Sequence, residues 1–169
     1  MSYSKIYFDM DGVLTDFGRG ITELCRMELP DGSIPQQEYD ERLFAAMRNT
    51  DRFYFKLHPI EGGLALFKEM RREYGDRVEI LTAVPKPKWN ISSADTDKLD
   101  WVEKYIGDGV KVNIVLRRDK ALFAKGPDHL LIDDTPMNIE EWTAAGGDGL
   151  LFTDAESARN GLVERGILE

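Results

Sequence analysis

Two aspartates separated by one residue, Asp9 and Asp11, follow the apolar run 6–8 and precede Gly12. A short strand that ends in a glycine-containing turn points side chains out of the carboxyl edge of a sheet, where open α/β folds place their ligands. One carboxylate can then attack as a nucleophile while the other transfers protons. Because most such pairs are only a solvated turn or a helix cap, phosphoryl chemistry requires partners elsewhere in the chain.

Those partners follow three further apolar stretches of strand length. Each stretch ends in a hydroxyl, an ammonium group or a carboxylate pair, at Thr82, at Lys120, and at Asp133 with Asp134. Because parallel strands present their carboxyl ends at one edge of a sheet, the four strand ends are expected to converge on one site.

Hydrolysis of a phosphate monoester requires cations, oriented donors and an attacking group held in line with phosphorus. In this pattern Asp9 attacks and becomes an aspartyl phosphate. Asp11 protonates the departing alkoxide and later takes a proton from the attacking water. Thr82 offers its hydroxyl and nearby backbone N–H groups to the phosphoryl oxygens, and Lys120 adds a positive charge.

Four carboxylates in one site also require a cation. Each like-charge pair at ~4 Å costs about 4 kcal/mol at an effective dielectric constant of about 20. Mg²⁺ is the expected ion, because it accepts carboxylate, carbonyl, water and phosphate oxygens and needs few protein ligands.

The order of these motifs resembles that of the haloacid dehalogenase-type phosphohydrolase superfamily. Longer stretches are similar to the 5'(3')-deoxyribonucleotidase branch over about residues 5–153, namely 9–14 with Asp16 and Phe17, 101–105, 118–120, and 130–134 followed by Pro136. The resemblance implies that Asp9, the backbone carbonyl of Asp11, and Asp134 bind Mg²⁺. Asp133 then lies behind the ion and accepts from Lys120, although the two acids of the pair could exchange roles.

Neighbouring charges offer alternatives to these assignments. Lys125 could replace Lys120, but Lys120 follows a β-branched run directly and matches the Arg-Asp-Lys of the family. Asp119 is interpreted as a helix N-cap. Arg117 and Arg118 either support the phosphate electrostatically or are solvated surface charges.

Strand-like and helix-like stretches alternate, which predicts an α/β fold with a Rossmann-like parallel sheet flanked by helices. The expected strands are residues 5–9, 77–82, 111–115, 129–133 and 149–153. The expected core helices are residues 60–74, 94–106, 136–145 and 155–165. The second helix is expected to begin after Ser93 and to place Leu99, Val102 and Ile106 on one face.

The segment between the first strand and the first core helix is too long for a simple connection. It contains two helix-like stretches, about 19–29 and 37–49, and is expected to form a small helical cap that closes over the site. Phe17 and His58 would mark its hinges. The expected division is an α/β core of residues 1–17 and 58–169 and a cap of residues 18–57.

The cap is expected to select the leaving group. The nucleotidases that this chain resembles have a longer cap, whose Trp and Phe rings embrace the base. This cap has no Trp and carries Arg48 near the position where a ring is expected. Phe17 and the aromatic cluster 53–55 are candidate stacking partners or simply the core of the cap. Ala83 occupies the candidate phosphate-binding position after Thr82, where the family often has a hydroxyl residue.

Composition limits the classes of function. The 169 residues support one domain with a small insertion, and 42% hydrophobic and 31% charged residues are typical of a globular chain. A net charge of −9 disfavours long nucleic acids as partners, but permits a small phosphorylated substrate. The absence of a long apolar span or a signal peptide predicts a cytoplasmic protein without a membrane partner. The oligomeric state stays open, a homodimer included.

These observations favour a Mg²⁺-dependent phosphatase, with a (deoxy)nucleoside monophosphate as the best candidate substrate. A phosphatase for another metabolite, such as a sugar phosphate, is the alternative. A phospho-accepting receiver module uses similar residue types, but its acidic pair comes first along the chain. It also lacks a proton donor two residues after the phosphorylated aspartate.

Overall fold

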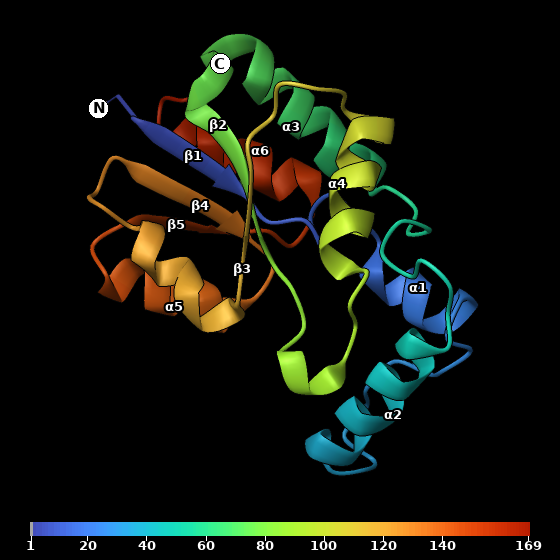
Figure 1. The fold of residues 1–169 in the computed structure, drawn as a ribbon. Helices are drawn as coiled ribbons and strands as arrows, with labels where there is room; N and C mark the ends of the chain where they lie inside the picture. The colour runs from blue at the N-terminus through green and yellow to red at the C-terminus, as the bar shows by residue number, and fades with distance from the viewer. Residues whose placement is uncertain (1) are drawn as a thin grey trace.

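The computed structural model describes residues 2–169 and contains a five-stranded parallel sheet flanked by helices (Figure 1). The strand order is β3-β2-β1-β4-β5, so β1 lies at the centre between β2 and β4. The strands are β1 Lys5–Phe8, β2 Val78–Ala83, β3 Val112–Val115, β4 His129–Asp133 and β5 Asp148–Leu151. This architecture confirms the predicted α/β fold.

Residues 2–169 also form six α-helices and three 3₁₀ helices. The α-helices are α1 Phe17–Glu23, α2 Gln36–Arg48, α3 Glu61–Tyr74, α4 Ala94–Tyr105, α5 Pro136–Ala144 and α6 Ala155–Glu164. The 3₁₀ helices span Gly75–Arg77, Pro87–Trp89 and Arg117–Phe123. No helix within residues 2–169 is long and apolar enough to cross a membrane.

The two faces of the sheet carry separate hydrophobic clusters, because successive residues of a strand point to opposite faces. Ile6 and Phe8 of β1 belong to the cluster formed with α3, α4 and α6, and Phe67 of α3 packs edge-on against Phe8. Tyr7 lies on the opposite face, against Trp142 of α5. Both faces of the sheet are therefore covered, as a parallel sheet requires.

Helix α4 begins after Ser93 as predicted, but its buried face differs from the predicted one. Leu99 is 47% exposed, whereas Asp97 and Lys98 are buried beside Trp101. The expectation that Leu99 points inward is wrong, because the charged residues have ionic partners inside the molecule. Hydropathy alone assigns such residues to the solvent side of a helix.

Helices α1 and α2 lie between β1 and α3 in the chain, beyond the carboxyl end of β1 (Figure 1). Helix α2 lies close to the predicted stretch 37–49. Helix α1 is N-capped by Asp16 and is much shorter than predicted. It ends at Glu23 because the chain then turns through Arg26, which has a left-handed φ of 54°.

The two ends of this insertion are joined by backbone hydrogen bonds. Asp16 N donates to His58 O at 2.7 Å, and Ile60 N donates to Leu14 O at 2.8 Å. The chain therefore leaves and re-enters the sheet layer at a single point.

Gly63 allows α3 to pack directly on the loop that follows β1. A Cβ atom at Gly63 would lie 1.8 Å from the carbonyl oxygen of Val13. We expect Gly63→Ala to destabilise the fold by about 1–3 kcal/mol, which lowers the melting temperature by roughly 2–12 °C. Gly18→Ala on α1 is the matched control, because its Cβ would meet the nearest atom at 3.7 Å. Equal melting temperatures for the two variants in thermal unfolding would contradict this packing role.

Candidate active site

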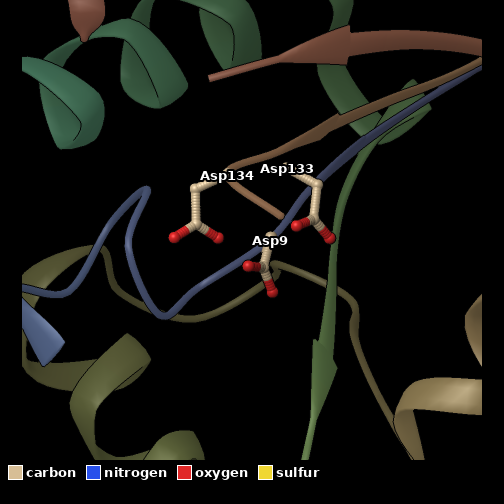
Figure 2. Close-up of side chains that lie close together, drawn as sticks. All are labelled: Asp9, Asp133 and Asp134. Atoms are coloured by element: carbon tan, nitrogen blue, oxygen red, sulfur yellow. The ribbon is translucent and has the colours of Figure 1, made fainter. Parts of the chain in front are cut away.

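Three aspartates from the ends of β1 and β4 point toward a common centre (Figure 2). Asp9, Asp133 and Asp134 each offer a carboxylate oxygen, and these oxygens all lie within 4.8 Å of one another. The pairing of Phe8 with Ile132 in neighbouring strands sets this approach. The structure thus brings together the first and last acidic motifs of the sequence.

Lys120 lies buried between two of these carboxylates. Its Nζ is 2.7 Å from Asp9 Oδ1 and 2.8 Å from Asp133 Oδ2. Lys125, the alternative from the sequence, is exposed. Asp119 lies inside the 3₁₀ helix, and its N–H already donates to Leu116 O. Its assignment as an N-cap is therefore wrong, because the helix begins before it.

The two acids at the end of β4 have different surroundings. Asp133 is fully buried and accepts from Lys120, from the Thr135 backbone N–H and from the Asn138 amide. The carboxylate of Asp134 has only a long contact of 3.4 Å with Thr135 Oγ1 among the hydrogen bonds of residues 2–169. Asp134 is therefore the acid with oxygens available to a cation.

Gly12 makes room for Asp134. A Cβ atom at Gly12 would lie 1.9 Å from Asp134 Oδ2, and its φ of 87° disfavours any other residue. The glycine of the first motif thus allows the loop after β1 to approach the end of β4.

Asp11 is held at both of its carboxylate oxygens. Thr15 Oγ1 donates to Oδ1 at 2.8 Å, and Lys98 Nζ donates to Oδ2 at 2.7 Å. Lys98 also donates to Thr82 Oγ1 at 2.8 Å. The structure therefore joins two of the predicted site residues through a lysine that the sequence analysis missed.

Lys98, Thr15 and Asn138 are the site residues without a recognisable sequence signal. Lys98 lies in a helix with charges on several faces, and only its burial distinguishes it from its neighbours. Asn138 follows Asp133 by five residues, across the turn into α5, and this spacing brings its amide to the Asp133 carboxylate. The acidic pair in the sequence indicates this contact only weakly.

A hollow of about 420 Å³ opens in front of these groups. Asp9, Asp11, Lys120 and Asp134 line its floor. Its walls come from the end of β2 and the loop after it, helix α1 and the rest of the insertion, the 3₁₀ helix Arg117–Phe123 and the start of α5. The wall residues are Ala83, Val84, Pro85, Phe17, Gly18, Phe44, Tyr54, Arg117, Thr135 and Asn138. Thr82 is fully buried beneath this surface, so its neighbour Ala83 lies closer to the opening.

Some of the predicted aromatic and basic residues line the hollow, and others lie away from it. Of the cluster 53–55, Tyr54 lines the hollow with Phe17, at a ring distance of 6.2 Å. Arg48 instead donates to the backbone carbonyl of Trp89 at 2.7 Å. Arg117 lines the hollow, whereas the side chain of Arg118 is 76% exposed.

The acidic cluster holds more negative than positive charge. Burial raises the pKa of Asp9 from its ordinary 3.8 to about 8, and the charges of Asp133 and Asp11 add to the shift against the opposing charge of Lys120. Burial and Asp133 also raise the pKa of Asp134. Counting Asp11 and Lys98, four carboxylates face two ammonium groups, so one divalent cation would balance the fully ionised cluster. The all-oxygen donor set fits a hard cation such as Mg²⁺.

Comparison with known proteins identifies the relatives of this chain. The family model for the 5' nucleotidase, deoxy (pyrimidine), cytosolic type C protein matches residues 3–161. The human mitochondrial 5'(3')-deoxyribonucleotidase is 32% identical over 166 residues, which cover 88% of this chain and 70% of that protein. The human cytosolic-type enzyme is 27% identical over 165 residues, with coverages of 88% and 79%.

Solved structures share the fold at lower identity. A hydrolase from Streptococcus pneumoniae has a TM-score of 0.54 at 19% identity and covers 96% of this chain and 100% of its own. The HAD-hydrolase YfnB from Bacillus subtilis, solved with bound magnesium, has a TM-score of 0.54 at 13% identity and covers 92% of each chain.

The fold and these relationships define a haloacid dehalogenase-type phosphohydrolase, a phosphoric monoester hydrolase. Within this class, the chain belongs to the cytosolic type C family of deoxy (pyrimidine) 5'-nucleotidases. The resemblance noted in the sequence is confirmed.

The raised pKa of Asp9 predicts a specific pH dependence for the metal-free protein. Between about pH 4 and pH 8 the folded state retains a proton on Asp9 that the unfolded state has lost, so stability falls as pH rises through this window. Asp9→Asn removes this loss. We expect the stability of Asp9→Asn relative to wild type to increase from pH 4 to pH 8, measured by urea unfolding with EDTA present. Parallel stability curves for the two proteins would contradict the shift.

Proposed function

We propose that this protein is a Mg²⁺-dependent 5'(3')-deoxyribonucleotidase that hydrolyses (deoxy)nucleoside monophosphates through an aspartyl phosphate. One observation carries the proposal. In a chain of the nucleotidase family, Asp9 lies on the floor of an open hollow with Lys120 at 2.7 Å and with Asp11 and Asp134 beside it.

The proposed reaction has two steps. In the first, an Asp9 oxygen attacks phosphorus, the ester P–O bond breaks, and the leaving oxygen takes a proton from the Asp11 carboxyl group. In the second, water attacks the phosphorus of the aspartyl phosphate while Asp11 accepts its proton, and the P–O bond to Asp9 breaks. Inorganic phosphate leaves, and both carboxyl groups return to their starting states.

The other residues act on charge and position. Lys120 places its ammonium group beside Asp9 and offsets the negative charge of the phosphoryl group. The backbone at Thr82 and Ala83 lies at the carboxyl end of β2, where its N–H groups are candidate donors to phosphoryl oxygens. Asp133 fixes Lys120 through its second contact, at 2.8 Å.

Asp9, the backbone carbonyl of Asp11, and Asp134 would hold the metal ion. When bound, Mg²⁺ supplies positive charge that polarises the phosphoryl oxygens and neutralises the cluster. The free oxygens of Asp134 and the occupied oxygens of Asp133 support this choice between the two acids.

The rings of Phe17 and Tyr54 are the proposed contacts for the base of a nucleotide. The hollow of about 420 Å³ falls within the usual range of small-molecule sites, roughly 300–1,000 Å³. The insertion of residues 18–57 acts as the cap that covers this leaving-group side, with the paired backbone around Asp16 and His58 as its hinge.

A phosphatase for a non-nucleotide metabolite is the second candidate. It is supported by Arg48, which lies near the position where a base-stacking ring is expected from the resemblance and whose guanidinium donates to the Trp89 carbonyl. A cytoplasmic location stays a prediction, since the named relatives include both cytosolic and mitochondrial enzymes.

Release of inorganic phosphate from a panel of deoxyribonucleotides, ribonucleotides, sugar phosphates and an aryl phosphate tests the function. We expect deoxyribonucleotides to give the highest kcat/KM, and we expect Asp9→Asn to lower turnover by at least about 10³-fold. Asp76→Asn is the control, because its side chain is 98% exposed beyond the amino end of β2. Undiminished turnover by Asp9→Asn would reject the nucleophile. Preference for sugar phosphates would favour the second candidate.

Metal binding is tested by thermal unfolding with and without Mg²⁺. At a Mg²⁺ concentration about 100 times Kd, binding stabilises the folded state by about 2.7 kcal/mol, which raises the melting temperature by roughly 5–10 °C. We expect Asp134→Asn to abolish this rise. We expect Asp133→Asn to lower the melting temperature without metal, because it weakens the buried contact with Lys120. The reverse pattern would exchange the roles of the two acids.

A further inference from the structure

Lys98 on α4 is a fully buried lysine that no sequence motif accounts for. Its side chain is 0% exposed. Its Nζ is 2.7 Å from Asp11 Oδ2, 2.8 Å from Thr82 Oγ1 and 4.5 Å from the centre of the Tyr54 ring. The ammonium group therefore faces two oxygen acceptors and an aromatic ring, a complete set of partners for a buried cation.

Burial of this charge costs free energy, so a lysine at this position needs a specific structural reason. Removing an ammonium group from water costs several kcal/mol unless close partners compensate. A leucine or methionine would fill the same helix position without that cost. The partners that offset the cost for Lys98 are two residues of the proposed catalytic site.

The chemistry of an ammonium group fixes the orientation of both partners. Because Lys98 can only donate, Thr82 Oγ1 accepts, and the hydroxyl proton of Thr82 points away from Lys98. The Asp11 carboxyl group is held by Lys98 on one oxygen and by Thr15 on the other, which fixes its rotation.

Helix α4 is itself anchored next to the insertion, which makes Lys98 a rigid support. Arg52 Nε donates to Asp97 Oδ1 at 2.9 Å, one residue before Lys98. Trp101 Nε1 donates to Leu57 O at 2.9 Å, one helical turn after it. The backbone that carries Lys98 is therefore held in place, and so are the partners of its ammonium group.

We propose that Lys98 is a positioning residue for the phosphatase reaction. It holds the Asp11 carboxyl group where the leaving-group oxygen departs. This inference rests on the proposed function, because it concerns the protonation of the leaving group. Lys98 does not touch the substrate; it acts through Asp11.

The experiment compares leaving groups that depend differently on protonation. A deoxyribonucleotide releases a basic alkoxide that needs a proton from Asp11, whereas p-nitrophenyl phosphate releases a stable phenolate that does not. Single-turnover rates of leaving-group release report the first step alone. Lys98→Met removes the ammonium group, and Lys98→Gln serves as a second variant that keeps a donor should the methionine variant fail to fold. Lys104→Met, exposed on the same helix, is the matched control.

We expect Lys98→Met to slow release from the deoxyribonucleotide by about 10²-fold and from p-nitrophenyl phosphate by less than about fivefold. The KM of either ester should change little, and Lys104→Met should match wild type. Equal losses for the two esters would show that Lys98 only supports the fold, and would overturn the inference. Unchanged release from the deoxyribonucleotide would also overturn it.

A double-mutant cycle with Asp11→Asn provides the second readout. If Lys98 acts through Asp11, adding Lys98→Met to Asp11→Asn should slow deoxyribonucleotide release little further. Additive losses would contradict the proposed coupling. A wild-type protein that releases phosphate from no ester would instead reject the proposed function, so the two failures are distinguishable.

Discussion

Compensation of buried negative charge is the constraint on which the rest of this structure depends. Asp9 and Asp133 are withdrawn from water at the carboxyl ends of the central strand β1 and its neighbour β4, with Asp134 beside them. Such carboxylates persist in a folded protein only with close cations and donors. Lys120 supplies part of the compensating positive charge. The positive charge that is still missing, which the raised pKa of Asp9 reflects, suits a divalent cation.

The same constraint explains how distant segments come together. The parallel pairing of β1 with β2 and β4 brings their carboxyl ends to one edge, and Gly12 allows the loop after β1 to approach Asp134. Helix α4 then turns Lys98 inward, because Asp11 and Thr82 provide oxygens for its ammonium group. Two buried lysines from different segments thus support the site from two sides.

The insertion over the site is held mainly by contacts other than buried ion pairs. Helix α2 meets the loop after β2 through the stack of Phe44 on Trp89 and through the hydrogen bond from Arg48. These contacts link the insertion to the core at the side of the hollow where a leaving group would extend. Family membership alone does not specify such contacts, and they make this region the natural place for substrate preference to differ among relatives.

The sequence by itself determined the parallel sheet, the convergence of its strand ends and the residue types of Asp9, Asp11, Lys120 and the acidic pair. Short-range apolar patterns and motif order encode these features. Tertiary structure alone decided that Lys98 is buried and that Leu99 is exposed. A charged residue turns inward only when its partners are in place, and those partners, 16 and 87 residues away in the chain, become its neighbours only in the folded molecule.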